Sequence, residues 1–466
     1  MPIATARRIG YRPRPRPLWT SREAFFTDAG LFLLGAAGAS SANIVGALPG
    51  CEVLLLPALP VLLLAQGKRA FDRRYLWFYI LTGAWLLGTL ISDAYNGIGA
   101  FNRAKGVARV VFFALDFMAL AILINNKTRR IVIFALSFAT VMFIGSLQFR
   151  GDFLEEWKFG IAQGVAVLAL LVSSHFYIRR KYWICFFISM VLAGLNLRYG
   201  FRSQLVVQLV AAVLVLPLFD EAKTSRNGSH AGQNRWRVLV FLVLAGSAAY
   251  AANAAIKYGS KIGLFDESTS AKFEGQASGD YGVLVGGRPE TLVAIQAIRD
   301  SPILGHGSFP YGQKYVQLKQ DIQYEHGYTD SDEPIEEEYP VIPTHSHLTM
   351  AWVEGGIPGG ICWIYIFALT VRSTFHLSSL RPGLAPLYCY FLVGFLWDIL
   401  YSPFGSVNRI WGAYFILLSY FILKTSEEQA QLVRHARAKQ ISLGRNLRPR
   451  RIAPSYPGNN LLPGRR

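Results

Sequence analysis

Two histidines stand where a polar stretch of the chain meets an apolar one. His345 and His347 lie in the run Thr-His-Ser-His-Leu, which leads into an apolar segment that reaches Val371. Imidazole exchanges a proton near neutral pH. Because of this position, we expect acid–base chemistry on a substrate anchored in a membrane. His345 is the first candidate and His347 the second.

Three arginines are candidates for binding a phosphate group near this junction. Arg202 begins an apolar segment four residues after Arg198, and Arg288 follows two glycines at the start of an amphipathic segment. A guanidinium group can donate two parallel hydrogen bonds to a phosphate and stays charged. A helix that begins at Arg288 would add backbone donors. Each arginine alone could equally serve the fold, and Arg198 could simply reach toward the membrane interface.

Further ionisable residues lie inside apolar segments, where a charge is costly and often functional. Arg109 and Asp116 are seven residues apart on one helical face, and we expect them to form a structural ion pair. Glu354 follows His345 by about two and a half helical turns. Asp398 lies in a later apolar segment.

The composition indicates the class of protein. The 466-residue chain is 52% hydrophobic and only 16% charged, which is too apolar for an ordinary soluble domain. Apolar segments near the length that spans a bilayer, about 20 residues, recur along it. The fold class is therefore an all-α polytopic membrane protein. We predict twelve spans, at 25–48, 51–67, 76–92, 107–124, 131–147, 159–177, 182–197, 203–219, 237–256, 348–371, 384–401 and 408–423.

The distribution of charge predicts the orientation in the membrane. Most of the 47 Lys and Arg residues lie in the two ends of the chain and in alternate loops, whereas the long segment 257–344 is acidic. Positive loops stay cytoplasmic, so both ends are predicted to be cytoplasmic and the long loop to face outward. The net charge of +18 then reflects topology rather than nucleic-acid binding, and contact of the basic tail with membrane lipid is expected.

The chain is thus divided into a basic arm, nine spans, one outer loop, three spans and a basic tail. The corresponding ranges are 1–24, 25–256, 257–344, 345–423 and 424–466. The Pro- and Arg-rich segments 1–22 and 434–466 are predicted to be disordered.

Within the outer loop, Arg288 to Asp300 is predicted to be a helix whose apolar face carries Leu292, Ile295 and Ile298. Ser301-Pro302 should end this helix, and a tight turn at Gly305–Gly307 should follow. The acidic residues between 330 and 338 lack the spacing of a calcium loop. All four cysteines lie in or beside apolar segments. We therefore expect no metal site and no cofactor.

These residues resemble the motifs of the O-antigen ligase and polymerase superfamily of bacterial envelope glycosyltransferases. His345-Ser346, nine residues, Gly356 and Gly359 follow the superfamily's histidine pattern. Gly287-Arg288 and the segment Asp300 to Phe309 resemble its loop helix and turn, and Arg202-Ser203-Gln204-Leu205 its arginine at the outer start of a span. Three departures are Phe201, Leu292-Val293 and Ser346, where the superfamily commonly has a small residue, an aromatic residue and asparagine. The resemblance covers mainly residues 195–410.

The resemblance implies an inverting, metal-independent transfer of a glycan from an undecaprenyl-pyrophosphate carrier to an acceptor sugar hydroxyl at the outer face of the bacterial inner membrane. Arg202 and Arg288 would hold the pyrophosphate, and His345 would accept the hydroxyl proton. Arg198, Ser346, His347 and Glu354 are expected to bind substrate. The expected partners are the carrier-linked glycan, an acceptor glycan or glycolipid, membrane lipid and other polysaccharide-assembly proteins.

Other functions stay open at this stage. Both ligation of a finished chain and polymerisation of repeat units fit the resemblance. A multi-pass transporter or flippase would also have many spans with charges inside them, and it would predict interrupted helices and related halves. A scaffold for an envelope complex would explain the arms and the loop but not the three motifs.

Overall fold

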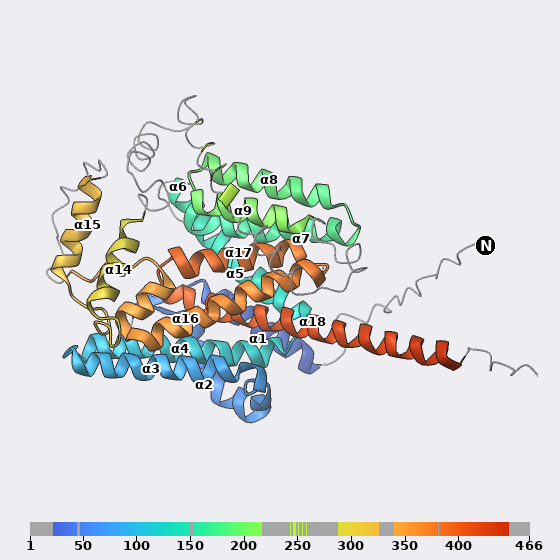
Figure 1. Cartoon of the computed structure of the whole chain (residues 1–466), viewed down its shortest axis with the longest axis horizontal. Coiled ribbons are helices and arrows are strands. Elements are labelled where there is room, and N and C mark those ends of the chain that lie inside the picture. The colour runs from blue at the N-terminus through green and yellow to red at the C-terminus, as the bar shows by residue number, and fades with distance from the viewer. Residues whose placement is uncertain are drawn as a thin grey trace, which may run out of the picture.

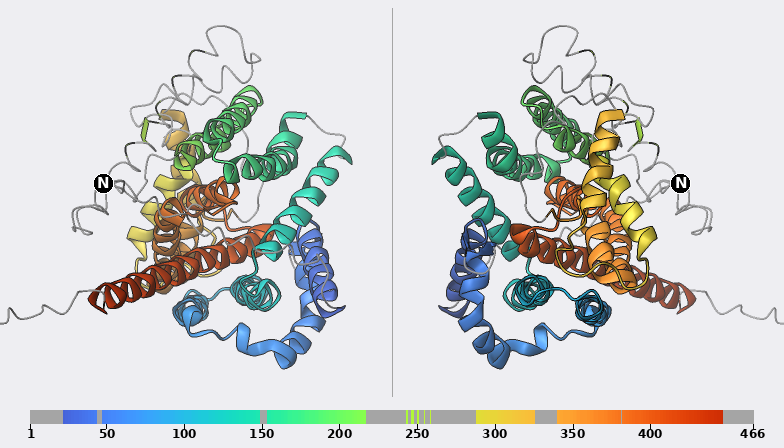
Figure 2. Two further views of the ribbon diagram at one scale, coloured as in Figure 1. Left: turned by 90° about the vertical axis from the view of Figure 1, so that its right-hand side faces the viewer. Right: turned by 90° about the vertical axis from the view of Figure 1, so that its left-hand side faces the viewer.

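The protein is described here from a computed structural model, and it is almost entirely helical (Figure 1). The structure describes residues 22–43, 47–148, 153–216, 288–325, 340–380 and 382–446, together with isolated positions between 243 and 258. The helices of the bundle run in similar directions, with α14 and α15 at one end and the long extension of α18 at the other (Figure 1). Seen along that axis, the helices form an irregular ring of packed layers (Figure 2).

The elements follow one another without any long strand among the described residues. In chain order they are α1 (Arg22–Gly38), β1 (Ser41–Asn43), β2 (Ala47–Pro49), α2 (Gly50–Gln66), the short turns of helix η1 (Gly67–Arg69) and η2 (Arg73–Tyr75), α3 (Leu76–Tyr95), α4 (Ala100–Ile124), α5 (Thr128–Gln148), α6 (Phe153–Glu156), the π-helical turn η3 (Trp157–Ile161), α7 (Ala162–Ile178), α8 (Tyr182–Arg198), α9 (Arg202–Val215), α14 (Pro289–Asp300), α15 (Gln313–Glu325), α16 (His347–Leu380), α17 (Ala385–Tyr401) and α18 (Ser406–Asn446).

The prediction of a polytopic α-helical membrane protein is confirmed at this level. Seven described helices are long and apolar enough to cross a membrane, and four shorter apolar helices accompany them. Eleven of the predicted spans overlap a described helix. The predicted ninth span, 237–256, lies largely outside the described residues, as does much of the outer loop. The count of twelve therefore stays a prediction.

The interior of the bundle is filled by aromatic and branched side chains. Trp85, Phe113, Trp363 and Phe404 are buried and pack edge-to-face or stacked on one another, and they join α3, α4, α16 and the start of α18. Ring pairs of this kind add attraction beyond the burial of area. The core therefore sits between these helices.

Glycine permits a close contact between α3 and α16. A Cβ at Gly88 of α3 would lie 2.7 Å from the carbonyl oxygen of Gly355 on α16. Gly355 belongs to the glycine-rich run Gly355-Gly356-Ile357-Pro358-Gly359-Gly360, and small residues of this kind let two helix backbones approach closely.

Two predicted boundaries are wrong. The first span was expected to continue to residue 48, but α1 ends at Gly38 and an antiparallel pair of short strands, β1 with β2, follows it. Residues 434–446 were predicted to be disordered, but α18 continues to Asn446. This stretch is rich in Ala, Gln, Lys and Arg, which favour helix, and its first proline is Pro449.

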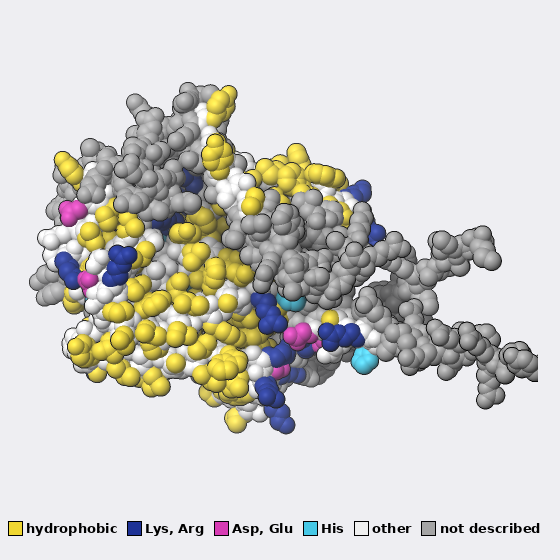
Figure 3. Space-filling view, in the orientation of Figure 1, with side chains coloured by type: hydrophobic (Ala, Val, Ile, Leu, Met, Phe, Trp, Pro, Cys, Tyr) yellow, Lys and Arg dark blue, Asp and Glu magenta, His cyan; other side chains and the backbone are white. Residues whose placement is uncertain are grey.

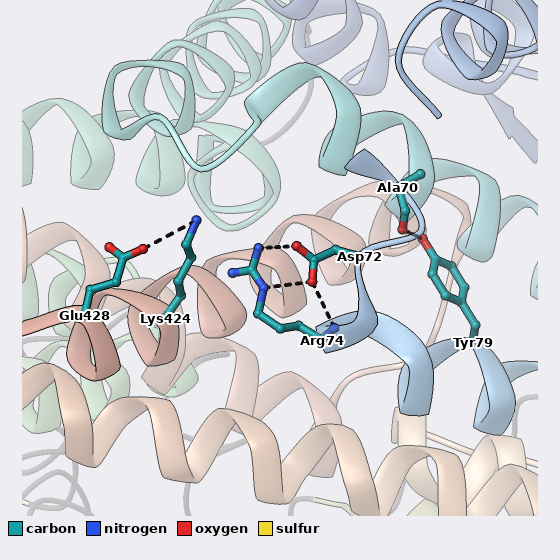
Figure 4. Close-up of polar contacts among 6 residues, drawn as sticks. All are labelled: Ala70, Asp72, Arg74, Tyr79, Lys424 and Glu428. Carbon is teal, nitrogen blue, oxygen red and sulfur yellow. Dashed lines mark hydrogen bonds and ion pairs between the residues drawn. The ribbon is translucent and has the colours of Figure 1, made fainter. Parts of the chain in front are cut away.

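The surface separates by chemical type along the bundle axis. Hydrophobic side chains cover the middle of the face shown in Figure 3, and Lys and Arg gather at the end from which α18 extends. At that end Asp72 accepts hydrogen bonds from Arg74, and Lys424 pairs with Glu428 at 3.6 Å (Figure 4). This is the end that the charge pattern predicts to be cytoplasmic.

Helices α14 and α15 form a cap over the opposite end of α16. Val293, Ala297, Tyr315 and Ile342 of the cap pack with Val353 of α16 in a small core of their own. The predicted start of α14 is confirmed, since Pro289 is its first residue. The predicted apolar face is right only in part: Ile298 packs against this core, but Ile295 is 39% exposed, and the buried positions are Val293, Ala294 and Ala297.

Candidate functional site

Arg288 stands at the N-terminus of α14, directly before Pro289. Its side chain is half-buried, and no hydrogen bond or ion pair to it is recorded among the described residues. Burial lowers the pKa of the guanidinium, and the negative charges of Glu290 and Asp398 act in the opposite direction. The group nevertheless remains a cation at physiological pH. A half-buried cation without a partner is suited to binding an anion.

His345 lies in the segment between the cap and α16, close enough to Arg288 for the two charges to interact. Burial lowers the pKa of the imidazole, and the positive charge of Arg288 lowers it further. The ring is half-buried, and no hydrogen bond to it is recorded among the described residues. The structure therefore brings together a cation and a predominantly neutral imidazole that are 57 positions apart in the sequence, and neither has a partner recorded in the described part of the chain.

The C-terminal end of α17 completes this cluster. Asp398 is near enough to Arg288 to interact with its charge, and its Oδ1 accepts a hydrogen bond of 2.7 Å from the Ser402 hydroxyl. Tyr401 also lies within electrostatic reach of Arg288. Arg288, His345, Asp398 and Tyr401 are hereafter called the outer cluster. Asp398 was predicted only as an intramembrane charge, without a connection to Arg288.

The two residues that follow His345 have positions that serve the fold. The Ser346 hydroxyl donates to the Ile399 carbonyl at 2.9 Å and accepts from the Thr349 amide at 3.1 Å, so it caps α16 and ties it to α17. His347 is 2% exposed. Its Nδ1 is 2.6 Å from the Ser402 carbonyl oxygen, and its ring packs on Trp363 and Phe404. Substrate binding by either residue stays a prediction.

The other two predicted arginines lie on the adjacent pair of helices. Arg202 is the first residue of α9 and is half-buried, and Arg198 is the exposed last residue of α8. Helix α9 packs on α17, where a Cβ at Gly394 would lie 3.8 Å from Val207. Arg202 is therefore carried by the helix that contacts the one bearing Asp398.

Glu354 is an ion-pair partner rather than a free carboxylate. Its Oε2 accepts a hydrogen bond of 2.6 Å from Nη1 of Arg109, and both side chains are buried. The predicted pair of Arg109 with Asp116 is therefore wrong. Sequence spacing places Arg109 and Asp116 on one helical face, but it does not reveal that α16 brings a carboxylate closer.

Helix α16 is interrupted at Gly356, whose φ of 66° and ψ of −156° are not helical. Pro358 has no amide hydrogen, so the Glu354 carbonyl cannot find its usual partner. The turn 302–307 of the outer loop supplies the missing bonds. His306 N donates to Val353 O at 2.7 Å, Gly307 N donates to Glu354 O at 3.1 Å, and Ile357 N donates to Ile303 O at 3.0 Å.

The predicted tight turn at Gly305–Gly307 is confirmed, and the structure shows that it contacts the break in α16. Both glycines have positive φ, and a Cβ at Gly305 would lie 2.7 Å from the Val353 carbonyl oxygen. Only glycine combines this backbone with so close an approach. The turn therefore fills the break in α16, and we call it the plug.

Asp93, at the outer end of α3, holds the plug and was missed by the sequence reasoning. It is fully buried and accepts hydrogen bonds from the Ser308 amide at 2.6 Å and the Ser308 hydroxyl at 2.9 Å. The next residue, Phe309, has its ring under Lys105 and Arg109, at 4.1 and 4.3 Å. A carboxylate at the end of an apolar segment was the available signal for Asp93.

Among the residues that the structure describes, no group of three or more His, Cys, Asp or Glu side chains could hold a metal ion. The acidic stretch between 330 and 338 lies outside these residues. The cysteines at 51, 185, 362 and 389 are buried free thiols.

The outer cluster can bind an anion through Arg288 and can take up a proton at His345. It lies at one end of the bundle, where the cap meets α16 and α17. No protein-family model matches this sequence, and a comparison with curated proteins finds no significant match. The motif resemblance to the O-antigen ligase and polymerase superfamily therefore stands without independent support.

Proposed function

We propose that the protein is an inverting, metal-independent glycosyltransferase of the bacterial inner membrane. It would transfer a glycan from an undecaprenyl-pyrophosphate carrier to an acceptor sugar hydroxyl during assembly of cell-surface polysaccharide. In this proposal the chain has twelve spans, both termini are cytoplasmic and the cap faces the periplasm. The observation that carries the proposal is that the charges of Arg288 and His345 interact, while neither side chain has a hydrogen bond or ion pair recorded among the described residues.

The chemistry requires one nucleophilic displacement. The acceptor hydroxyl oxygen forms a bond to the anomeric carbon, and the bond from that carbon to the pyrophosphate oxygen breaks. His345 takes the hydroxyl proton, which a neutral imidazole can do. Arg288, with Arg202 as a second cation, stabilises the negative charge that grows on the departing pyrophosphate.

The position at the end of the bundle suits a substrate whose lipid stays in the membrane. A carrier lipid could lie against the apolar surface while its pyrophosphate reaches Arg288. The acceptor, a glycan or glycolipid, would approach from the side of the cap. Both ligation of a finished chain and polymerisation of repeat units remain compatible with this arrangement.

One observation favours a second candidate, a transporter or flippase. Interrupted helices are a feature of transporters, and α16 is interrupted at Gly356. In this chain, however, a turn of the same protein fills the break and satisfies its backbone groups. We therefore rank transport second.

A reconstituted transfer assay with a carrier-linked glycan tests the role of Arg288. Arg288→Ala and Arg288→Lys should both lose transfer, because a lysine cannot form the paired hydrogen bonds of a guanidinium. Arg299→Ala, at the exposed other end of the same helix, is the matched control and should keep activity. Full activity of Arg288→Lys would show that a simple charge is sufficient.

Glycan profiling of a deletion strain separates the remaining alternatives. Carrier-linked polymer with an unmodified acceptor would indicate a ligase, and single repeats on the acceptor would indicate a polymerase. An unchanged glycan profile would remove the transferase proposal and favour transport.

A further inference from the structure

Asp116 is a buried carboxyl group that the proposed transfer reaction does not use. It lies in α4 between the buried aromatic residues Phe113 and Phe117, and it has no exposed surface. Neither of its carboxyl oxygens has a hydrogen-bond partner. A buried carboxylate in this position would lack the compensation that such groups need.

The nearest charged groups already satisfy each other. Arg409, in the first turn of α18, donates from Nε to Glu52 Oε1 at 2.5 Å and from Nη2 to Glu52 Oε2 at 2.7 Å. Both partners are buried, and Glu52 has no exposed surface. The pair is neutral as a unit. An ionised Asp116 would therefore add one unpaired negative charge to the interior.

We propose that Asp116 is a proton-binding site inside the bundle. Three described groups on the helices packed around α4 interact electrostatically with Asp116. They are Cys51 and Glu52 on α2 and Arg409 on α18. When ionised, Asp116 and Glu52 carry two negative charges, and Arg409 supplies one positive charge. The site is therefore neutral when it holds one proton.

This count allows two arrangements with the same net charge. The first has the observed geometry, in which Arg409 binds Glu52, and it places the proton on Asp116. In the other, the proton moves from Asp116 to Glu52 while Arg409 turns to Asp116, so no charge enters or leaves the bundle. A site of this kind links α2, α4 and α18, and its existence does not depend on glycan transfer.

Infrared difference spectroscopy on the full-length protein in lipid nanodiscs tests the proposal. At neutral pH the carbonyl stretch of a protonated carboxylic acid should include a component that Asp116→Asn removes. Asp28→Asn is the matched control, because Asp28 is equally buried but paired with Arg129 and Arg130, and it should leave this band unchanged. The absence of an Asp116 component would show an ionised carboxylate and overturn the proposal.

Glu52→Gln gives a test that does not require Asp116 to be changed. With Glu52 neutral, Arg409 should pair with Asp116, and the protonated band should again be lost.

Retention of the band in Glu52→Gln would contradict the exchange of partners. A thermal midpoint that rises with sodium chloride relative to choline chloride in the natural sequence, but not in Asp116→Asn, would indicate a bound metal cation and overturn the proton assignment.

Discussion

The plug and two members of the outer cluster, Arg288 and His345, belong to the same segment between the bundle helices, yet their polar groups are treated in opposite ways. In the plug, the exposed backbone groups at the break in α16 find partners, and Asp93 receives two hydrogen bonds from Ser308. In the outer cluster, Arg288 and His345 have no recorded partner among the described residues. Polar groups whose hydrogen bonds are formed within the protein stabilise a fold, whereas polar groups without such partners are available to a ligand. The comparison separates architecture from candidate chemistry within one stretch of chain.

The largest expected effect falls on the outer cluster. His345→Ala should lower kcat/KM for transfer by about 10²–10⁴-fold, the range of a lost general base, with little change in thermal stability. His175→Ala, at an exposed position of α7, is the control. Activity near that of the natural sequence would remove His345 from the mechanism.

For the buried ion pair of Arg109 and Glu354, we expect a loss of stability rather than a loss of catalysis. Glu354→Ala leaves the buried Arg109 unpaired and should destabilise the fold by about 3–5 kcal/mol. The double variant Arg109→Met with Glu354→Leu removes both charges and should recover most of that loss in denaturant unfolding. If the single variant unfolds like the natural protein, the pair does not support the plug.

The break itself should be sensitive to a single methyl group. Gly356→Ala places a Cβ against the Ile303 carbonyl oxygen in a backbone conformation that favours glycine, and strain of this kind costs about 1–3 kcal/mol. Gly405→Ala, where a Cβ meets nothing within 4 Å, should be near neutral. Equal melting temperatures for the two variants would argue against a plugged break.

Ser346→Ala should cost about 0.5–2 kcal/mol, as the loss of a helix cap does, and kcat should change little. Ser346→Thr keeps the hydroxyl and should retain stability. A large fall in kcat with unchanged stability would instead move Ser346 into the substrate site.

The smallest effect concerns pH. Burial and the positive charge of Arg288 lower the pKa of His345 below the ordinary value of an imidazole, so its neutral form persists to a more acidic pH. A general base acts only when neutral; transfer should therefore fall on the acid side, with a midpoint below 6.5. Arg288→Ala removes the second cause of the lowering, so the midpoint in its residual activity should move up. A midpoint above 6.5 in the natural sequence would contradict this environment.

Much of the fold could be predicted, because the length of the apolar segments and the positions of Pro and Gly determine it. The overlap of predicted spans with helices, the start of α14 at Pro289 and the turn at Gly305–Gly307 depend on neighbours in sequence. The pairing of Arg109 with Glu354 and the partner of Asp93 could not be predicted, since both join residues more than 200 positions apart.

Only part of the candidate site could be predicted, because its residues come from segments that lie far apart in the sequence. The motifs and the family resemblance predicted that Arg288 and His345 contribute to one site, and the structure places them close enough for their charges to interact; the position of Asp398 and Tyr401 beside Arg288 was not predicted. The bond of Ser346 to the Ile399 carbonyl and the contact of His347 with the Ser402 carbonyl could not be predicted, because both partners lie more than 50 positions further along.

The plug has a consequence for how the protein is made. A membrane helix with a gap in its hydrogen bonding is a poor substrate for insertion on its own, so α16 reaches its final shape only when residues 303–307 pack against it. Correct assembly of α16, α17 and α18 would thus depend on an intact loop. A substitution in the plug should therefore be recognised by membrane quality control as a defect of α16, about fifty residues downstream.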